Sequence, residues 1–346
     1  MCNIAGYVGT KPAAPILLEM MRKQDGWDCG HYVGMATMDE GKFYLKKLIG
    51  NLDMFMEKYT AEDFSGTVGF IHGRTPGQQG QHYDAWAHPF LGTGDQLLYM
   101  ANGVGGVFSK TSAPVQQQIY MQLKEEGYRF LTANADAGPK CPVMPDGMQV
   151  HATDVRCQMV QKNMNDGLSL PAAAAKANQQ VPSEVVSLAM HLQEPDSITW
   201  TRINYPMHVG VADHGIYLAT TPQAMPDDAR SITLLPALTS GRVYKDHYEF
   251  YPFKNPEITV APVTPSVWKA CYDAMEQTLS QGEMDHDDLD RLIRPLFPEA
   301  TCAPVSAVNY AIMQEFEKTG RLEIRRGSEP GTLPGSTAPK LYARLK

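Results

Sequence analysis

The chain opens with the stretch MCNIAGYVGT, residues 1–10. Its apolar run predicts a first strand that begins at Cys2. Because cells commonly remove the initiator Met before a small residue, Cys2 would then carry a free α-amine beside its thiol. Such an amine titrates near pH 8 and can take the thiol proton, so the residue would be a nucleophile with its own base. Alternatively, Cys2 is a small apolar residue packed on a strand, since free cysteines are commonly buried.

Composition narrows the class of protein. With 346 residues the chain exceeds the usual size of a single core, which predicts one large domain and a smaller one. A net charge of −8 argues against bulk binding to nucleic acid or anionic lipid, so small molecules and proteins are the expected partners. No run of 18 apolar residues occurs, and no basic segment precedes the opening. We expect a cytoplasmic protein without a membrane span.

The cysteines give no sign of a metal site or a disulfide framework. They are scattered and contain no CxxC pair, and no histidine stands at ligand spacing beside them. We therefore expect a reduced protein with no metal and no cofactor. Their positions are 2, 29, 141, 157, 271 and 302.

Strand and helix patterns arrive in blocks rather than in strict alternation, which favours a layered α+β fold with mostly antiparallel sheets. Helical patterns fall at residues 11–24, at 51–59 and within 181–193. Strand patterns fall at residues 2–8, on both sides of a turn at 39–41 within 31–48, at 66–73, 97–106, 207–221, 231–237 and 241–246.

The composition changes near residue 250. The segment YPFKNPEITVAPVTP, residues 251–265, has four prolines and no helical period, which predicts a linker or an extended arm across the first domain. Helical patterns follow at 266–281, 288–297 and 303–320, and two strands around a Gly/Pro-rich loop are expected within 321–346. Three helices followed by a hairpin are the outline of a winged helix. We therefore expect a first domain over 2–246, a linker over 247–265 and a small domain over 266–346.

Three polar clusters stand at predicted strand ends or turns. Arg74, in GFIHGRTPGQQG (69–80), suits bidentate capture of a carboxylate. His88 lies in AWAHPF (85–90). In YMANGVGGVF (99–108), the side chain of Asn102 and the backbone N–H of Gly103 form a candidate oxyanion hole. Taken singly, each cluster also fits a surface fork, a turn or a hairpin loop.

The order of these clusters resembles the glutaminase domain of class II glutamine amidotransferases, and in particular that of glucosamine-6-phosphate synthase. Arg74 is followed by His88 fourteen residues on, and by Asn102 after another fourteen. The matching stretches here are MCNIAGYVG, HGRTPG, AHPF and ANG. The likeness continues in EEGYRFLTANADAG (125–138) and VGVADHGIYLATTPQAM (209–225), and it covers residues 2–246 with a divergent middle.

The resemblance implies the four-layer αββα sandwich of the N-terminal nucleophile hydrolases. It also implies hydrolysis of glutamine to glutamate and ammonia through a thioester on Cys2. Asn102 and Gly103 would stabilise the oxyanion, Arg74 would bind the substrate α-carboxylate, and Asp136 would bind the α-ammonium. His72 and His88 match family positions, and each would have either a structural role, hydrogen-bonding the loops, or a catalytic one; His88 is the candidate for substrate binding.

Some residues depart from the family pattern. Asn3 replaces the usual glycine and would place a larger side chain beside the attacking thiol, and the turn RTPG lacks the family's tryptophan and Thr-His pair. The alternatives are therefore an amidohydrolase acting on another amide and a non-enzymatic regulator that senses glutamine.

The last hundred residues leave no room for an ammonia-consuming synthase domain. A separate synthase protein is therefore the expected partner, with residues 266–346 as its docking site. From Lys318 onward this segment has seven basic residues and two acidic ones. It fits a solvated hairpin on a module that binds a partner or a second copy of the chain, with contact to nucleic acid as the alternative.

Overall fold

The computed structural model describes residues 2–76, 84–136, 143–254 and 256–346. One antiparallel sheet is built from β1 (Asn3–Gly9), β2 (Tyr32–Asp39), β3 (Lys42–Ile49), β4 (Val68–Arg74), β9 (His208–Ala212), β10 (Gly215–Ala219) and β11 (Arg230–Leu234). The strand order is β11-β9-β10-β1-β4-β2-β3. The strand at the start of the chain is therefore central, hydrogen-bonded to β10 on one side and to β4 on the other.

A second antiparallel sheet stacks on the first. It contains β5 (Phe90–Leu91), β6 (Leu97–Val104), β7 (Glu184–His191), β8 (Ile198–Arg202), β12 (Thr239–Val243) and β13 (Tyr248–Pro252). The strand order is β13-β12-β8-β7-β6-β5. Within this sheet, Asn102 pairs with Val186 and Gly103 pairs with Val185.

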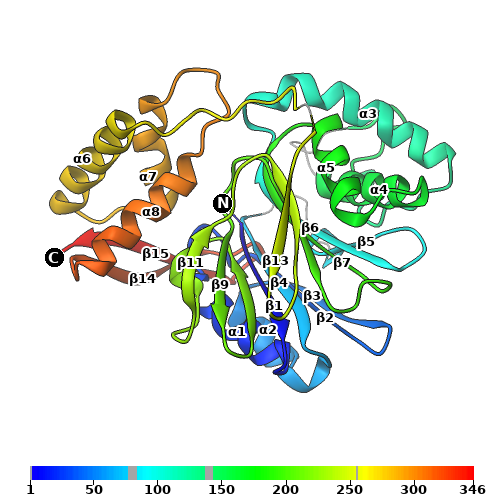
Figure 1. Ribbon diagram of the computed structural model, residues 1–346, viewed down its shortest axis with the longest axis horizontal. Coiled ribbons are helices and arrows are strands. Elements are labelled where there is room, and N and C mark those ends of the chain that lie inside the picture. Colours follow the sequence, from blue (N-terminus) through cyan, green and yellow to red (C-terminus); the bar gives the residue numbers. More distant parts are fainter. Residues whose placement is uncertain (1, 77–83, 137–142, 255) are drawn as a thin grey trace.

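Helices cover the outer face of each sheet (Figure 1). The first sheet is covered by α1 (Ala13–Gln24) and α2 (Leu52–Lys58), and the second by α3 (Ser109–Glu125), α4 (Ala152–Asn165) and α5 (Leu170–Gln180). Separate apolar cores fill the space between the sheets and the space under each helical layer. The expected sequence of layers, helix, sheet, sheet and helix, is therefore present.

The helix predicted within residues 181–193 is wrong. Residues Glu184–His191 form β7, which pairs with β6 on one side and β8 on the other. Every side chain from Val185 to His191 is buried, because one face of the strand packs between the sheets and the other packs under the helices. A strand buried on both faces loses the polar alternation that would reveal it, and a short apolar run then fits a helix equally well.

The C-terminal unit, residues 265–345, lies beside the sandwich (Figure 1) and has the expected order of elements. It consists of α6 (Pro265–Gln281), α7 (His286–Ile293), α8 (Val305–Lys318) and the hairpin of β14 (Leu322–Pro330) and β15 (Thr337–Leu345). The arm that precedes it crosses the sandwich, and its residues Phe253 and Ile258 are buried in the core under α3, α4 and α5. The assignment of this unit as a winged helix, and the domain boundaries, stay predictions.

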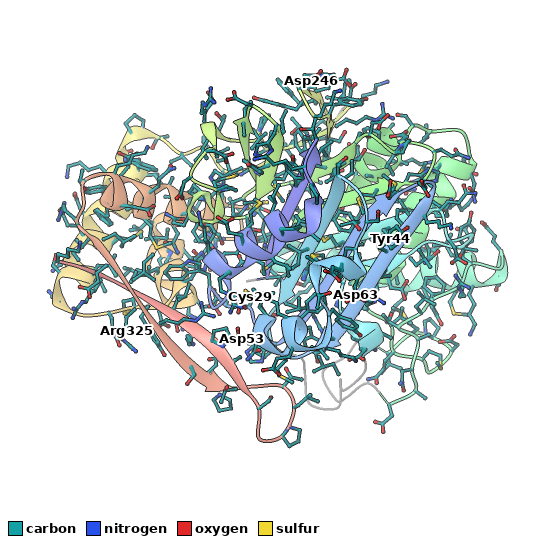
Figure 2. All side chains as sticks on the ribbon, turned by 90° about the horizontal axis from the view of Figure 1, so that it is seen from below. Cys29, Tyr44, Asp53, Asp63, Asp246 and Arg325 are labelled. Atoms are coloured by element: carbon teal, nitrogen blue, oxygen red, sulfur yellow. The ribbon has the colours of Figure 1, made fainter. Side chains whose placement is uncertain are left out.

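The C-terminal unit shares a core with the sandwich. Trp27, from the turn after α1, is fully buried among apolar residues of α6, α7 and α8. The hairpin runs alongside the part of the sandwich that carries Cys29 and Asp53 (Figure 2), and Leu341 donates its backbone N–H to the carbonyl of Gly26 at 2.9 Å. Removing residues 266–346 would therefore expose Trp27 to water, so experiments on this protein require the full chain.

A buried ion pair joins the two parts. His286 Nδ1 donates to Asp28 Oδ2 at 2.9 Å, and His286 Nε2 lies 3.8 Å from Asp290 Oδ1. The ring also packs on Tyr310 with 4.4 Å between centroids, and Asp287 borders the pair. Burial lowers the pKa of His286, but the carboxylates of Asp290 and Asp28 outweigh it and raise that pKa above its ordinary value.

This pair predicts a pH dependence of stability. A raised histidine pKa contributes stability that is fully present below pH ~6.5 and is lost as the pH rises through the folded-state pKa. Breaking a buried pair costs about 3–5 kcal/mol. We expect the difference in melting temperature between wild type and His286→Gln to be largest at pH 5–6 and to shrink by pH 9. The exposed pair of His247 and Asp246 supplies the control, because His247→Gln should leave the profile unchanged. A difference that does not vary with pH would contradict the expectation.

Candidate active site

Strand alternation brings several candidate residues to one layer of the molecule. Ile4 and Val8 of β1, Val68 and Phe70 of β4, and Leu98 and Met100 of β6 all lie in the core between the sheets. Residues an even number of positions away in the same strand share that face. Four candidate side chains near the strand ends therefore point toward the space between the sheets. They are Cys2, His72, Arg74 and Asn102.

Cys2 is partly buried, and its sulfur lies beside the residue that follows Arg74. The backbone N–H of Thr75 donates to Cys2 Sγ at 3.5 Å, and the Thr75 hydroxyl lies 3.7 Å from the same sulfur. Sequence reasoning missed Thr75, although its place directly after Arg74 at the end of β4 was a usable signal. Met1 and most of the RTPGQQGQ loop, residues 77–81, lie outside the described residues.

Arg74 is fixed by its surroundings. It is only 8% exposed, its guanidinium lies 4.6 Å from the centre of the Tyr32 ring, and its Nη1 donates to the carbonyl of Trp86 at 3.5 Å. Stacking and hydrogen bonding orient the guanidinium fork, as bidentate binding of a carboxylate requires.

Asn102 and Gly103 have the features expected of an oxyanion hole. Asn102 is fully buried, yet neither polar atom of its side chain has a hydrogen-bond partner among the described residues. Buried amides are normally paired, so an unpaired one at a strand end suits a ligand. A side chain at position 103 is excluded, because a Cβ atom there would lie 2.2 Å from the carbonyl oxygen of Glu184.

Two buried histidines, His72 and His88, and the half-buried His151 lie next to this site. The rings of His72 and His88 lie 4.0 Å apart, and those of His88 and His151 lie 5.0 Å apart. Burial lowers the pKa of His72 to about 3 and holds the pKa values of His88 and His151 well below the ordinary range. The neutral His72 donates from Nε2 to the carbonyl of Ala101 at 3.1 Å, which ties β4 to the strand that carries Asn102.

The sequence did not single out His151. It precedes α4, and its Nδ1 accepts the backbone N–H of Thr153 at 3.1 Å, so it caps the helix. Its contact with His88 depends on a chain reversal that no local pattern reveals. His88 itself is buried, and both of its ring nitrogens lack hydrogen-bond partners among the described residues.

The structure also shows where Asn3 and Asp136 lie. Asn3 does not crowd Cys2, because its side chain points to the opposite face of β1 and donates to the carbonyls of Gln24 and Trp27 at 3.0 and 2.8 Å. Asp136 is exposed, and its backbone N–H donates to the side chain of Asn134. The structure gives Asp136 no contact with the other candidates in the described part of the chain, so its role stays a prediction.

One group of described residues has the side chains that metals use. The ligand atoms of Asp28, His286 and Asp287 lie within 4.8 Å of one another. Since His286 Nδ1 already donates to Asp28, we assign this group to the ion pair that joins the C-terminal unit to the sandwich. The described cysteines are unpaired, and no helix in the described ranges is both long and apolar enough to cross a membrane.

Comparison with solved structures defines the class of fold. Glutamine phosphoribosylpyrophosphate amidotransferase from B. subtilis superposes with a TM-score of 0.57 at 14% identity, over 80% of this chain and 58% of that one. A structure described as the allosteric regulatory enzyme of purine biosynthesis superposes with a TM-score of 0.58, also at 14% identity and with the same coverage. The mixed α/β fold is therefore similar to the fold of these two enzymes.

Sequence relatives point to the same class. Glutamine–fructose-6-phosphate aminotransferase of Caldanaerobacter subterraneus subsp. tengcongensis is 25% identical over 256 residues, which cover 72% of this chain and 36% of the relative. The enzyme of the same name from Methanothermobacter thermautotrophicus is 26% identical over 228 residues, covering 65% of this chain and 34% of the relative. The resemblance to class II glutamine amidotransferases is confirmed. No family model matches the chain, and the chain spans about a third of the length of these relatives.

Proposed function

We propose that this protein hydrolyses the side-chain amide of glutamine as the glutaminase component of an amidotransferase. The α-amine takes the proton of the Cys2 thiol, the resulting thiolate attacks the amide carbon, and the α-amine passes the proton to the leaving nitrogen. The C–N bond breaks, ammonia departs and a thioester remains. Water then attacks the thioester, the C–S bond breaks and glutamate is released.

The observation that carries this proposal is the convergence of three groups on the space between the sheets. The sulfur of Cys2 supplies a nucleophile, the unpaired amide of Asn102 supplies an oxyanion donor, and the oriented guanidinium of Arg74 supplies a carboxylate site. We assign the second oxyanion donor to Gly103, the α-ammonium site to Asp136, and a supporting position beside Arg74 to His88.

The test is release of glutamate and ammonia from L-glutamine by the purified full chain, compared with L-asparagine, glutaramate and simple aliphatic amides. We expect glutamine to be the preferred substrate. Preference for an amide without an α-ammonium group would favour an amidohydrolase of the same fold. That alternative is supported by the exposed position of Asp136, the residue assigned to the α-ammonium. Binding of glutamine without hydrolysis would favour the sensing regulator.

We further propose that a separate synthase protein consumes the ammonia, with the C-terminal unit as its docking site. The chain alone should therefore release free ammonia and glutamate in equal amounts, measured by paired enzymatic assays on one sample. A clear deficit of ammonia would contradict this, because it would mean that the chain itself transfers nitrogen to an acceptor.

The charges of the hairpin support a protein partner over nucleic acid. Six basic side chains in and around the hairpin form ion pairs with carboxylates. The pairs are Arg325 with Glu283, Arg326 with Asp25 and Arg344 with Glu323, and Lys318, Arg321 and Lys340 are paired in the same way. A basic segment neutralised in this way offers little uncompensated charge to a phosphate backbone.

A further inference from the structure

A cavity of about 470 Å³ lies beside Gly103, on the face of the second sheet that points away from Cys2. Ala101 and Gly103 of β6 line it, together with Val185 of β7 and the first turns of α3 and α4. Ala101 and Val185 belong to the core under the helices, whereas Asn102 is directed to the space between the sheets. The cavity therefore meets the candidate active site at Gly103 but occupies a different layer.

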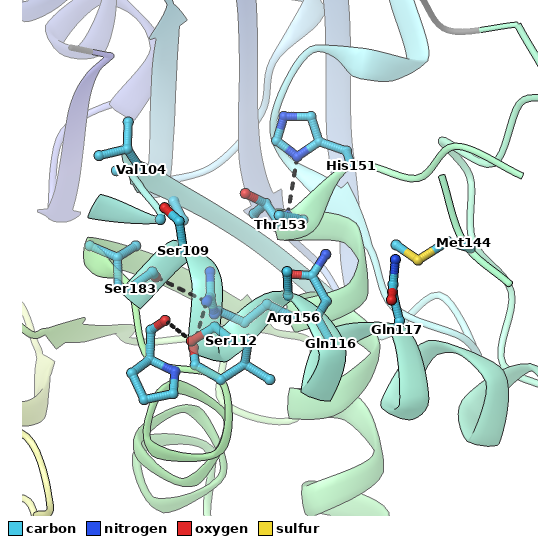
Figure 3. A pocket seen from close by; sticks show the side chains of 18 residues that line it. Val104, Ser109, Ser112, Gln116, Gln117, Met144, His151, Thr153, Arg156 and Ser183 are labelled. Carbon is cyan, nitrogen blue, oxygen red and sulfur yellow. Dashed lines mark hydrogen bonds between the residues drawn. The ribbon is translucent and has the colours of Figure 1, made fainter. Parts of the chain in front are cut away.

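Arg156 is the charged residue of the described lining, and it is deeply buried. It is only 5% exposed, and its Nη2 donates to the carbonyl of Val181 at 2.8 Å and to the hydroxyl of Ser183 at 3.0 Å (Figure 3). Its Nε has no hydrogen-bond partner, and no carboxylate pairs with the guanidinium among the described residues. Since a buried cation without a counterion costs several kcal/mol, the arrangement favours an anion in the cavity.

The rest of the lining has the same electrostatic preference. Ser109 and Ser112 lie in the first turn of α3, and Ala152 and Thr153 in the first turn of α4. Helix N-termini carry a partial positive charge, so two of them and a guanidinium act on one space. His151 adds no negative charge, and Gln116 and Gln117 add side-chain amides that can donate hydrogen bonds (Figure 3).

The cavity is close enough to Gly103 for a small ligand to reach both. Ser183, which accepts from Arg156, stands two residues before Val185, and Val185 is paired with Gly103. Two residues of extended chain span ~7 Å. The volume falls within the range of small-molecule sites.

We propose that this cavity binds a small organic molecule through a carboxylate held by Arg156. One buried cation matches the single charge of a carboxylate better than the nearly double charge of a phosphate. The inference goes beyond the proposed glutaminase function and does not depend on it, because binding can be measured without turnover.

The experiment is calorimetric titration of the full chain with pentanoate, with its uncharged counterpart pentanol, and with inorganic phosphate. We expect saturable binding of pentanoate that is at least tenfold tighter than that of the other two. Ala113 is exposed on α3 and lines the cavity, so Ala113→Asp should weaken pentanoate binding at least tenfold by charge repulsion without disturbing the core. Val115, exposed on the same helix and outside the described lining, supplies the matched control, and Val115→Asp should change the affinity less than twofold.

Arg156→Gln should weaken binding at least as much as Ala113→Asp. If Arg156→Gln does not fold, the comparison of Ala113→Asp with Val115→Asp still tests whether the cavity binds a carboxylate. Absence of saturable pentanoate binding, equal effects of Ala113→Asp and Val115→Asp, or equal affinity for pentanol would overturn the proposal. Tighter binding of phosphate would overturn the assignment to a carboxylate. Failure of the chain to hydrolyse glutamine would contradict the proposed glutaminase function but would not contradict the carboxylate site.

Discussion

Replacing Cys2 with alanine should abolish hydrolysis of glutamine, with a fall in kcat of at least ~10⁴-fold, because no other described residue that we place on the inter-sheet face has a thiol that can form the thioester. The fold should survive, since Cys2 is partly exposed and, among the described residues, its sulfur forms hydrogen bonds only with Thr75. Steady-state kinetics and a melting curve on the same preparation test both statements. A glutamine analogue with an electrophilic diazoketone side chain should add one label, at Cys2.

Cys29 supplies the matched control. It is buried close to the start of β1, where Asn3 Nδ2 donates to its sulfur at 3.2 Å, and burial together with the Asp25 carboxylate raises the pKa of its thiol. Such a thiol stays protonated, so Cys29→Ser should keep nearly full activity. Labelling at Cys29, or at Cys141 in the segment outside the described residues, with Cys2 unlabelled would remove the proposed mechanism.

The intact mass of natively expressed protein shows whether Met1 has been removed. Self-activation needs a free α-amine on Cys2, so the active protein should lack Met1. Full activity in a sample whose mass includes Met1 would show that another group takes the thiol proton.

Replacing Asn102 with alanine should lower kcat roughly a hundredfold or more and leave KM nearly unchanged. If its side-chain N–H meets the oxyanion, the interaction exists only in the transition state. Arg74→Ala should instead mainly raise KM, because it would remove a contact made to substrate and transition state alike. Both statements follow from kcat and KM measured side by side on the two variants.

Two further variants separate chemistry from packing. Asn102→Asp keeps the size of the side chain but places an acceptor where a donor is needed, so its kcat should fall as far as that of Asn102→Ala. Asn178 is also fully buried but lies on α5, in the outer helical layer, so Asn178→Ala should change stability and not kcat. A rise in KM alone for both Asn102 variants would mean that the oxyanion hole lies elsewhere.

The sequence by itself determined many of the local elements and the candidates at their ends, although it did not predict the outer helices α3, α4 and α5. The strand that follows Cys2, the polar clusters at Arg74 and Asn102, and the three helices and hairpin of the C-terminal unit all follow patterns that are complete within a short window. Turn residues and the periods of apolar residues are local properties, so they can be recognised without knowing what packs against them.

Only the tertiary structure decided which face each residue occupies and what covers it. β7 appeared helical because both of its faces are buried, Asn3 proved to point away from Cys2, and Trp27 proved to belong to the core of the C-terminal unit. The contact of His88 with His151 and the cavity around Arg156 join residues that are far apart in the chain. Such contacts form when whole layers stack and leave no periodic trace in the sequence, so the order of residues could propose a nucleophile but could not reveal the cavity beside Gly103.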